Sequence, residues 1–207
     1  LLHNQTTANG FTGLINYNKV SDDDYYTDLS SDITSTSKTQ LLQQGMLTYG
    51  GGGWWNASIN FQQYQTLQSD ENNPVLEQYR MLPQITFNAR KPDFHGTDLN
   101  FLGQYTHFTI KEREQFGTIY PDGNRTVLYP QISLPYVTPG WYVTPKLGVN
   151  YRSYSLTGQA AGSPGSISVS LPIFSIDSGM TFERSSRWFG RDYTQTFHLA
   201  ELQRLLE

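Results

Sequence analysis

Few side chains in this sequence have the types and spacing that enzyme chemistry requires. Three consecutive carboxylates, Asp22, Asp23 and Asp24, could hold a hard cation through their oxygens, but a solvated loop is the favoured interpretation. The segment Asp177–Gly179 places a serine beside an acid, without the glycine pattern of a nucleophile elbow. The histidines show no metal-ligand spacing; they are His3, His95, His107 and His198. We therefore expect no catalytic residue, no metal site, no cofactor and no enzymatic activity.

Two groups of residues contain basic side chains that could have a binding or anchoring role. Lys146 and Arg152 share the polar side of one predicted strand, where acidic lipid headgroups or a partner protein could meet them. Pairing with neighbouring acids, as ordinary wall charges, is the favoured alternative. The second group, at a predicted turn, consists of Arg184, Arg187, Arg191, Trp188 and Phe189. This mixture is typical of anchoring at a membrane interface.

The strand that positions the first group is Trp141–Arg152, with the sequence WYVTPKLGVNYR. Apolar and polar residues alternate along it, so one face of the strand is apolar and the other polar. It is longer than the five or six residues typical of a strand, and a strand that crosses a bilayer needs about 9–11. Its apolar face ends in Trp141 and Tyr151, as the aromatic girdles of membrane barrels do. On this strand alone, a membrane strand and a strand over a soluble core are equally open.

The composition favours a wall between lipid and water. Charged residues are 15% of the chain, below the roughly 25% of soluble domains, whereas aromatic residues reach 14%. There is no cysteine, so a disulfide framework and a thiolate metal site are both excluded. No apolar run approaches eighteen residues, which excludes a membrane helix. The net charge of -4 gives no reason to expect nucleic acid as a partner.

Connections that alternate between short and long predict the fold. The expected strands are Phe11–Val20, Leu41–Tyr49, Trp54–Tyr64, Gln84–Arg90, Leu99–Ile110, Thr126–Leu134, Trp141–Leu156, a strand or strand pair at Ile167–Phe182, and one beginning at Tyr193. The long loops are Ser21–Thr39, Gln68–Leu82, Lys111–Arg125 and Thr157–Gly165; the short turns include Gly50–Gly53, Lys91–Thr97, Pro135–Gly140 and Glu183–Asp192. This pattern predicts an all-β chain, an antiparallel up-and-down meander of about ten strands within a transmembrane outer-membrane β-barrel. A Greek-key sandwich has no reason to sort its loops in this way.

The alternation also assigns residues to faces. We expect a lipid-facing wall formed by Trp55, Ile59, Phe61, Trp141, Val143, Leu147 and Val149. We expect the lumen-facing side chains, available to lipid or to a plug protein, to be Asn56, Ser58, Asn60, Gln62, Thr144, Lys146, Asn150 and Arg152.

Three further features qualify the meander. Pro130, Pro145 and Pro172 should mark places where strand pairing is locally broken, because proline donates no hydrogen bond to a ladder. The apolar side of Leu99–Ile110 switches near His107, which indicates a bulge or an exit from the membrane. The tail His198–Glu207 has leucines at helical spacing, so we divide the chain into a barrel segment, residues 1–197, and a helical tail, residues 198–207.

Six short motifs, taken in order, resemble the barrel domain of the LptD family, the outer-membrane lipopolysaccharide-assembly proteins. They are INYNKVSDDDYYTDL at Ile15–Leu29, LPQITF at Leu82–Phe87, LYPQISL at Leu128–Leu134, YVTPKLG at Tyr142–Gly148, LPIFSIDSGMTFER at Leu171–Arg184 and YTQT at Tyr193–Thr196. The resemblance covers the chain from Leu1 to about Thr196.

The resemblance implies a function and partners. The chain would be an internal part of a barrel that inserts lipopolysaccharide into the outer leaflet of the outer membrane of a Gram-negative bacterium. In the family, the lipoprotein LptE plugs the lumen, and a periplasmic Lpt bridge delivers the lipid through an N-terminal domain. That domain, an export signal and the terminal barrel strands are not recognisable in this sequence. The alternatives are a porin-like passive channel and a soluble β-sandwich binding module.

Overall fold

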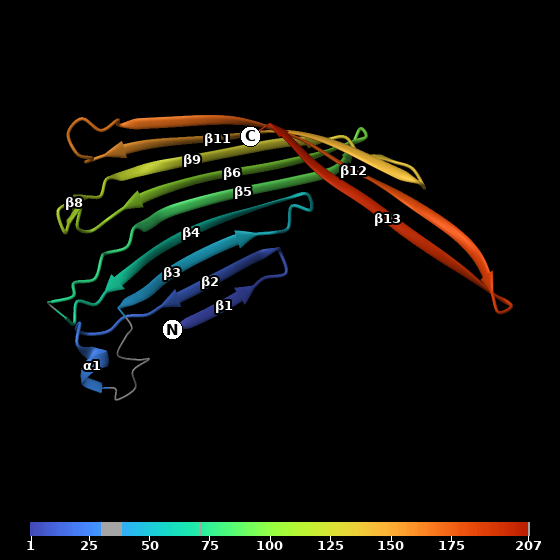
Figure 1. Ribbon diagram of the computed structural model, residues 1–207. Coiled ribbons are helices and arrows are strands. Elements are labelled where there is room, and N and C mark those ends of the chain that lie inside the picture. Colours follow the sequence, from blue (N-terminus) through green and yellow to red (C-terminus); the bar gives the residue numbers. More distant parts are fainter. Residues whose placement is uncertain (30–38, 71, 207) are drawn as a thin grey trace. The chain divides into compact units, whose positions relative to one another are not determined.

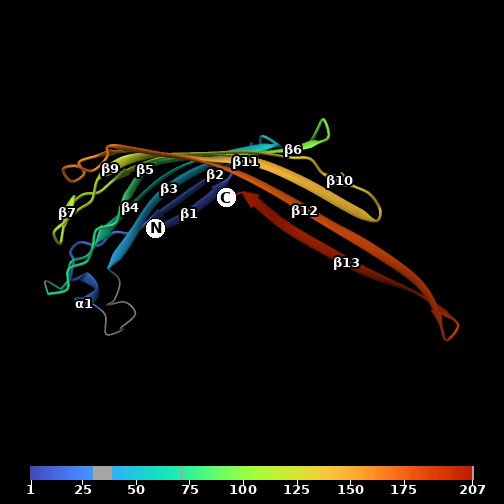
Figure 2. The same cartoon turned by 45° about the horizontal axis from the view of Figure 1, so that its top comes forward.

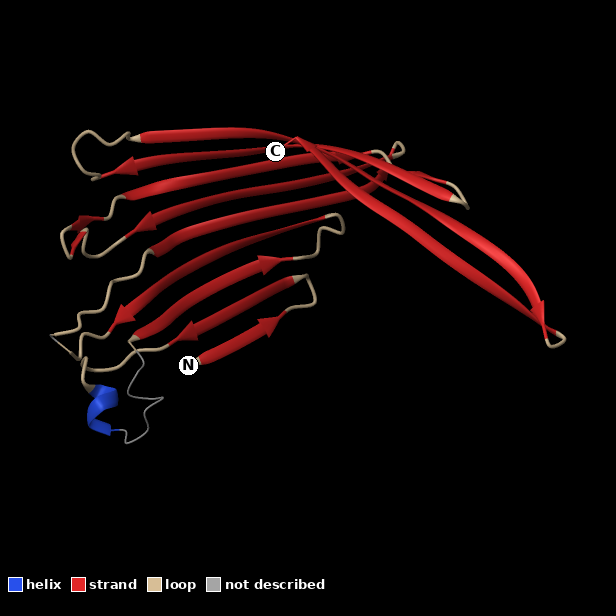
Figure 3. Cartoon of the chain, viewed as in Figure 1, coloured by secondary structure: helices blue, strands red, loops and turns tan. Residues whose placement is uncertain are grey.

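The structure, a computed structural model, describes residues 1–29, 39–70 and 72–206, and nearly all of its regular elements are strands (Figures 1 and 3). The strands are β1 (Leu2–Thr6), β2 (Phe11–Tyr17), β3 (Gln40–Tyr49), β4 (Trp55–Thr66), β5 (Arg80–Phe94), β6 (Thr97–Thr109), β7 (Glu114–Gln115), β8 (Thr118–Ile119), β9 (Asp122–Ser133), β10 (Tyr136–Val137), β11 (Trp141–Thr157), β12 (Ser166–Trp188) and β13 (Arg191–Leu206). A short helix, α1 (Tyr25–Leu29), follows β2. No described helix is long and apolar enough to cross a membrane.

The main sheet follows the order of the chain. Its strands are arranged β1-β2-β3-β4-β5-β6-β9-β11-β12-β13, with the short β10 paired to β11, so successive long strands are neighbours (Figure 2). The hairpin β7–β8 forms a separate two-stranded sheet within the connection from β6 to β9. The predicted all-β, antiparallel, up-and-down meander of about ten strands is therefore confirmed.

The chain divides into two compact units, and long strands such as β5 and β9 contribute to both. Unit 1 comprises Leu1–Asn88, Gly103–Val127 and Arg152–Ser168. Unit 2 comprises Ala89–Leu102, Leu128–Tyr151 and Val169–Glu207.

Strand register in unit 1 sorts side chains onto two faces, because residues directly opposite in an antiparallel pair share a face. Phe11 pairs with Tyr49, and Leu47 pairs with Ile59. These residues lie on one face, which we call the apolar face of unit 1. Asn60 pairs with Met46 on the opposite face, which we call the polar face of unit 1.

Burial is inverted relative to a soluble domain. Among the described residues, the buried apolar side chains are Val20, Leu41, Leu67 and Ile110, all near the long connections. The buried polar side chains are Asn60, Thr106, Gln115 and Ser133. Large apolar side chains along the strands, such as Phe61 and Leu147, stay exposed. The strands therefore do not bury their apolar face in a protein core.

The C-terminal region corrects the helical prediction for His198–Glu207. The strand β13 continues to Leu206 and pairs with β12, for example Ser178 with Glu201. Helix propensity is a weak preference of roughly half a kcal/mol per residue, and the backbone hydrogen bonds of a long neighbouring strand override it. The predicted division at residue 197 therefore has no counterpart in secondary structure.

The expected turn at Glu183–Asp192 is also too wide. The strand β12 runs unbroken through Pro172 to Trp188, and the turn consists of Phe189 and Gly190, whose φ angles are 51° and 75°. Positive φ at both central residues is typical of the tightest hairpin turns. Pro130 and Pro145 likewise lie inside β9 and β11 without ending them.

Candidate functional site

A row of aromatic rings crosses the apolar face of unit 1 at its short-turn end. The ring centroids of Phe11 and Tyr49 are 4.8 Å apart, those of Tyr49 and Trp55 are 5.0 Å apart, and those of Trp55 and Phe87 are 5.6 Å apart. The row thus joins β2, β3, β4 and β5. Aromatic girdles of this kind mark the water boundary of membrane barrels.

The same face becomes polar again toward the long connections. The amide of Gln63 donates to Gln43 Oε1 over 2.9 Å, and Gln43 Nε2 donates to the carbonyl of Asn18 over 3.1 Å. Gln65 exchanges two hydrogen bonds of 3.1 Å with the backbone of Val20. The apolar band on β4 is therefore confined to Trp55–Phe61, about 20 Å at 3.3 Å per residue, close to the band of about 25 Å in membrane barrels.

On β6, polar groups gather near the predicted change of parity at His107, within a strand that runs continuously through Thr109. Asn124 Oδ1 accepts a hydrogen bond of 2.9 Å from the Tyr105 hydroxyl and lies 2.7 Å from His107 Nδ1. These three groups share a face of β6 and β9. They mark the polar end of the band as the glutamines do on β3 and β4.

The polar face of unit 1 is a cross-strand network of amides and hydroxyls. Gln44 donates to Asn60 over 2.9 Å, Asn88 donates to Asn56 over 3.1 Å, and Gln84 donates to Thr106 over 3.3 Å. Asn60 is 6% exposed and Thr106 0%. Buried polar groups that are hydrogen-bonded in this way form a rigid wall at little energetic cost.

A cation also belongs to this polar face. Arg125 Nη2 donates to Gln104 Oε1 over 2.7 Å, and Gln104 Nε2 donates to Thr86 over 3.3 Å. The Arg125 guanidinium also lies 5.2 Å from the centre of the Phe108 ring, a distance at which cation–π attraction acts.

In unit 2, glycines let side chains lie flat on the wall. Leu147 of β11 is 52% exposed, whereas its neighbour Gly148 is buried beneath Tyr129 and Gln131, which leave little room for a Cβ at Gly148. The Tyr142 ring covers Gly179 in the same way, and its hydroxyl donates to Asp177 Oδ1 over 3.3 Å. The Asp-Ser-Gly segment therefore has a packing role.

The structure separates the predicted sets by face. Trp55, Ile59 and Phe61 alternate with Asn56, Ser58, Asn60 and Gln62 along β4. Trp141, Val143, Leu147 and Val149 alternate with Thr144, Lys146 and Asn150 along β11. Within the apolar sets, Phe61, Trp141, Leu147 and Val149 are exposed, whereas Trp55, Ile59 and Val143 are half-buried. Thr144, Lys146 and Asn150 are half-buried, and Arg152 is exposed.

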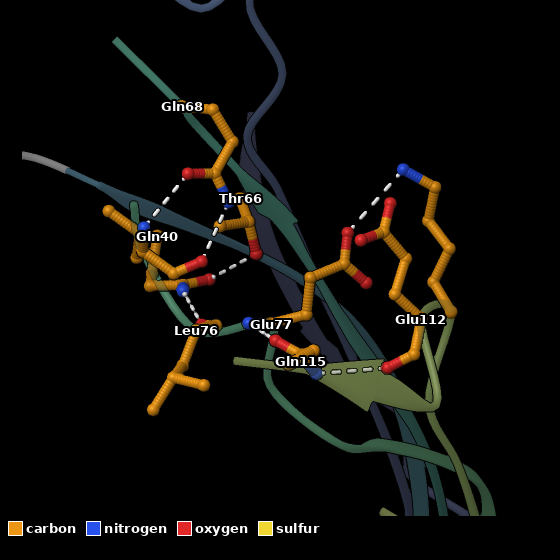
Figure 4. Close-up of polar contacts among 9 residues, drawn as sticks. Gln40, Thr66, Gln68, Leu76, Glu77, Glu112 and Gln115 are labelled. Atoms are coloured by element: carbon orange, nitrogen blue, oxygen red, sulfur yellow. Dashed lines mark hydrogen bonds and ion pairs between the residues drawn. The ribbon is translucent and has the colours of Figure 1, made fainter. Parts of the chain in front are cut away.

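Long connections of unit 1 are fastened to one another through glutamines (Figure 4). Gln115, 7% exposed, accepts a hydrogen bond of 2.7 Å from the Glu77 backbone and donates one of 3.0 Å to the Glu112 carbonyl. Gln40 donates to the Leu76 carbonyl over 2.9 Å. Lys111 Nζ lies 3.4 Å from Glu77 Oε1. The connections β4–β5 and β6–β9 therefore form one packed cap.

Aromatic side chains and an ion pair complete this cap. Tyr79 packs edge-on against Phe108 and Tyr120, and its hydroxyl donates to the Pro121 carbonyl over 2.8 Å. Burial, and then the nearby Asp122 and Tyr120, raise the pKa of the Tyr79 hydroxyl, so the hydroxyl stays protonated as a donor. The Asp122 carboxylate binds the Arg113 guanidinium.

Within the described residues, no three His, Cys, Asp or Glu side chains come together to hold a metal ion. In the acidic cluster, the Asp22 carboxylate accepts a hydrogen bond of 2.6 Å from Ser21, and the Asp24 carbonyl accepts one from the Asp28 backbone at α1. Sequence reasoning missed Gln115, because nothing in a polar loop distinguishes a buried glutamine. The loop segment 30–38 lies outside the described residues.

Comparison with known proteins agrees with this geometry. The family model "LptD: LPS transport system D" matches residues 1–200. LPS-assembly protein LptD of Azoarcus sp. (strain BH72) is 44% identical over 95% of this chain and 24% of that protein. The corresponding protein of Aromatoleum aromaticum is 43% identical over 94% of the chain and 23% of its own length, and that of Nitrosospira multiformis 38% over 94% and 21%. The chain thus spans about a quarter of the length of these curated relatives. By its strand pattern and by sequence along nearly its whole length, the chain belongs to the LptD family.

Proposed function

We propose that this chain forms a section of the wall of an outer-membrane β-barrel that inserts lipopolysaccharide into the outer leaflet. The observation that carries the proposal is the inverted burial. Apolar side chains bounded by an aromatic row stay exposed on one face, while amides and hydroxyls are hydrogen-bonded on the other. The relatives are named LPS-assembly proteins, which supports a role in lipopolysaccharide assembly.

The two faces suit an amphipathic cargo. Lipid acyl chains would contact the apolar face of unit 1, on which Ile59 lies, and the apolar side of β11, on which Leu147 and Val149 lie. Sugars and phosphates would pass the opposite, polar sides. No bond is made or broken in this transfer, so the wall acts through shape and polarity. We propose that the barrel segment extends through β13, in place of the division at residue 197.

Polar side chains of each unit could also contact a plug protein. We propose that a lipoprotein of the LptE type contacts Asn60 and Gln62 in unit 1, and Lys146 and Arg152 in the polar side of β11. Lipid would arrive through a periplasmic bridge and a further domain of the whole protein. The long connections Ser21–Thr39, Gln68–Leu82 and Lys111–Arg125 would lie on the cell surface, with the short turns in the periplasm of a Gram-negative bacterium.

The alternatives fit the wall less well. A soluble sandwich would bury its apolar strand face, whereas Phe61, Leu147 and Val149 are exposed. A porin-like channel would have the same wall with an open lumen, and single-channel conductance of the whole protein separates it from a plugged translocon.

Photo-crosslinking of adjacent positions tests the proposal. A photoreactive amino acid placed at Phe61 or at Gln62 of the whole protein, in living cells, samples opposite faces of one strand. We expect Gln62 to crosslink to the plug lipoprotein or to lipopolysaccharide, and Phe61 to membrane lipid. Crosslinks from Phe61 to a plug protein, with lipid only at Gln62, would overturn the assignment of faces.

A further inference from the structure

The hairpin β12–β13 continues beyond its neighbour β11. The Thr181 amide donates to the carbonyl of Gly140 over 2.9 Å, one residue before β11 begins. Beyond this point β12 pairs with β13, from Phe182 with Phe197 to Trp188 with Arg191 (Figure 1). We call Phe182–Phe197 the arm. Its paired strands run for about 20 Å at 3.3 Å per residue.

The arm presents two faces, because side chains alternate along each of its strands. Register divides its side chains between two faces. One face carries Phe182, Phe197, Arg184, Gln195, Ser186, Tyr193 and Arg191, and Met180 and Leu199 precede them on the same face. The other face carries Glu183, Thr196, Ser185, Thr194, Arg187 and Asp192. Phe182 is 56% exposed and Phe197 63%, although both are large and apolar.

Carboxylates are confined to one face of the arm. Both carboxylates of the arm, Glu183 and Asp192, lie on the polar face, where Arg187 Nε is 3.5 Å from Asp192 Oδ1. The face with the phenylalanines has two arginines, Arg184 and Arg191, and no carboxylate among its described residues. This face combines positive charge with exposed aromatic rings. Anionic lipid headgroups attract basic side chains, and aromatic rings favour the headgroup level of a membrane.

The arm's aromatic face continues the apolar wall of unit 2. Tyr142, on the polar side of β11, covers Gly179 and bonds Asp177, so these odd-numbered residues of β12 share the polar side. Met180 and Phe182 consequently lie on the opposite side. Met180 also contributes to a surface hollow whose lining includes Trp141 and Val143 of β11 and Gly179 of β12. The apolar side of β11, on which Trp141 and Val143 lie, therefore continues along the arm.

We propose that the aromatic and basic face of the arm lies on the anionic phospholipid headgroups of the periplasmic leaflet. The inference rests on the proposed membrane wall and adds a surface to it. The order of residues along the face matches the change from hydrocarbon to headgroup. The apolar pairs Met180–Leu199 and Phe182–Phe197 come first, and Arg184, Tyr193 and Arg191 follow at the level of the phosphates, with their stems along the lipid.

Single cysteines test the arm directly, because the chain has no cysteine of its own. Val149→Cys, Tyr193→Cys and Thr194→Cys would each carry an environment-sensitive fluorophore, in protein reconstituted into phosphatidylethanolamine–phosphatidylglycerol vesicles. Spin-labelled lipids then report contact with the bilayer by quenching. We expect quenching at Val149 and, by a headgroup-level spin label, at Tyr193, with roughly threefold less at its neighbour Thr194, which the register places on the opposite face.

The outcomes separate the arm from the wall. Quenching at Val149 with none at Tyr193 would refute the arm's contact and leave the wall in place. Absence of quenching at Val149 would refute the membrane wall and the arm together. If the fluorophore at position 193 were protected from quenching by iodide in the water, yet not quenched by the spin-labelled lipids, lipid contact would be refuted. A protein, or a second copy of the chain, would then cover the arm.

Charge provides the second test. Removing one arginine near an anionic surface should weaken the arm's partition onto it about fivefold. Arg184→Gln should therefore lower lipid quenching at position 193, and the decrease should disappear in vesicles of purely zwitterionic lipid. Arg187→Gln is the matched control on the opposite face and should have little effect. Equal effects of the two substitutions would contradict the proposal.

Discussion

Replacing Gln115 by leucine should loosen the cap formed by the long connections of unit 1. The substitution keeps the approximate volume of the side chain but removes the hydrogen bond from the Glu77 amide and the one to the Glu112 carbonyl. Since Gln115 is buried, water cannot fully replace these partners. Leaving a buried donor unsatisfied costs about 1–3 kcal/mol.

Hydrogen exchange of the Glu77 amide measures this cost. If the cap opens locally, a loss of about 1.4–2.8 kcal/mol speeds exchange roughly ten- to hundredfold. Gln68→Leu is the matched control, because Gln68 also makes two hydrogen bonds, both to the backbone of Val75, but at an exposed position. There water can take over, and exchange at Val75 should rise less than about fivefold.

The two variants show whether local stability depends on the burial of the glutamine or on the number of its hydrogen bonds. Similar acceleration at Glu77 and Val75 would mean that the number of hydrogen bonds alone sets local stability. An unchanged rate at Glu77 in the Gln115→Leu protein would refute the view that this glutamine holds the two connections together.

Further predictions concern the faces, the topology, a loop carboxylate and the isolated chain. Arginine at Ile59 or Val149 should destabilise the membrane-inserted protein by roughly 2–4 kcal/mol near the bilayer midplane, and arginine at Ser58 or Asn150 by much less; unfolding titrations in vesicles would show equal costs if the faces are wrong. A thiol reagent applied to whole cells should label Ser69→Cys but not Ala8→Cys, and the reverse result would invert the topology. Gly52 is unsuitable as a cysteine position, because a Cβ there would meet the Trp55 ring. Hydrogen bonds from the Asn73 side chain and the Asn72 amide lower the pKa of the Asp70 carboxyl. The turn at Asp70 should therefore persist above the ordinary carboxyl pKa and open as the pH falls through the lowered pKa, which an NMR titration of the Asn72 amide would detect. Asn73→Ala should bring the pKa of Asp70 back toward its ordinary value. Because it spans about a quarter of its relatives, this chain alone should not restore growth or surface lipopolysaccharide to cells depleted of the whole protein, and complementation would refute that.

The sequence predicted most of the strands because their signal is local. A period of two along Trp55–Phe61 and Trp141–Tyr151 assigns each side chain to a face without knowledge of any neighbour. The spacing of long and short connections then determines an up-and-down order. Both inferences agree with the structure.

The errors occurred where local and tertiary preferences differ. The segment His198–Leu206 has helix-forming residues, yet it forms a strand, because it pairs with the edge of β12. The turn predicted at Glu183–Asp192 consists of only two residues in the structure. The paired strands gain backbone hydrogen bonds as far as the tightest turn that the φ angles allow.

The sequence alone thus determined the strands, their two faces and the family resemblance, since alternation and short motifs depend on residues close together in the chain. Only the tertiary structure revealed the aromatic row from Phe11 to Phe87, the Tyr142 ring on Gly179, and the cap held by Gln115. Each of these features brings together residues far apart in the chain. Tyr142 and Asp177 are 35 residues apart, and Glu77 and Gln115 are 38 residues apart. Strand register brings such residues together, and register is a property of paired strands that no single segment contains.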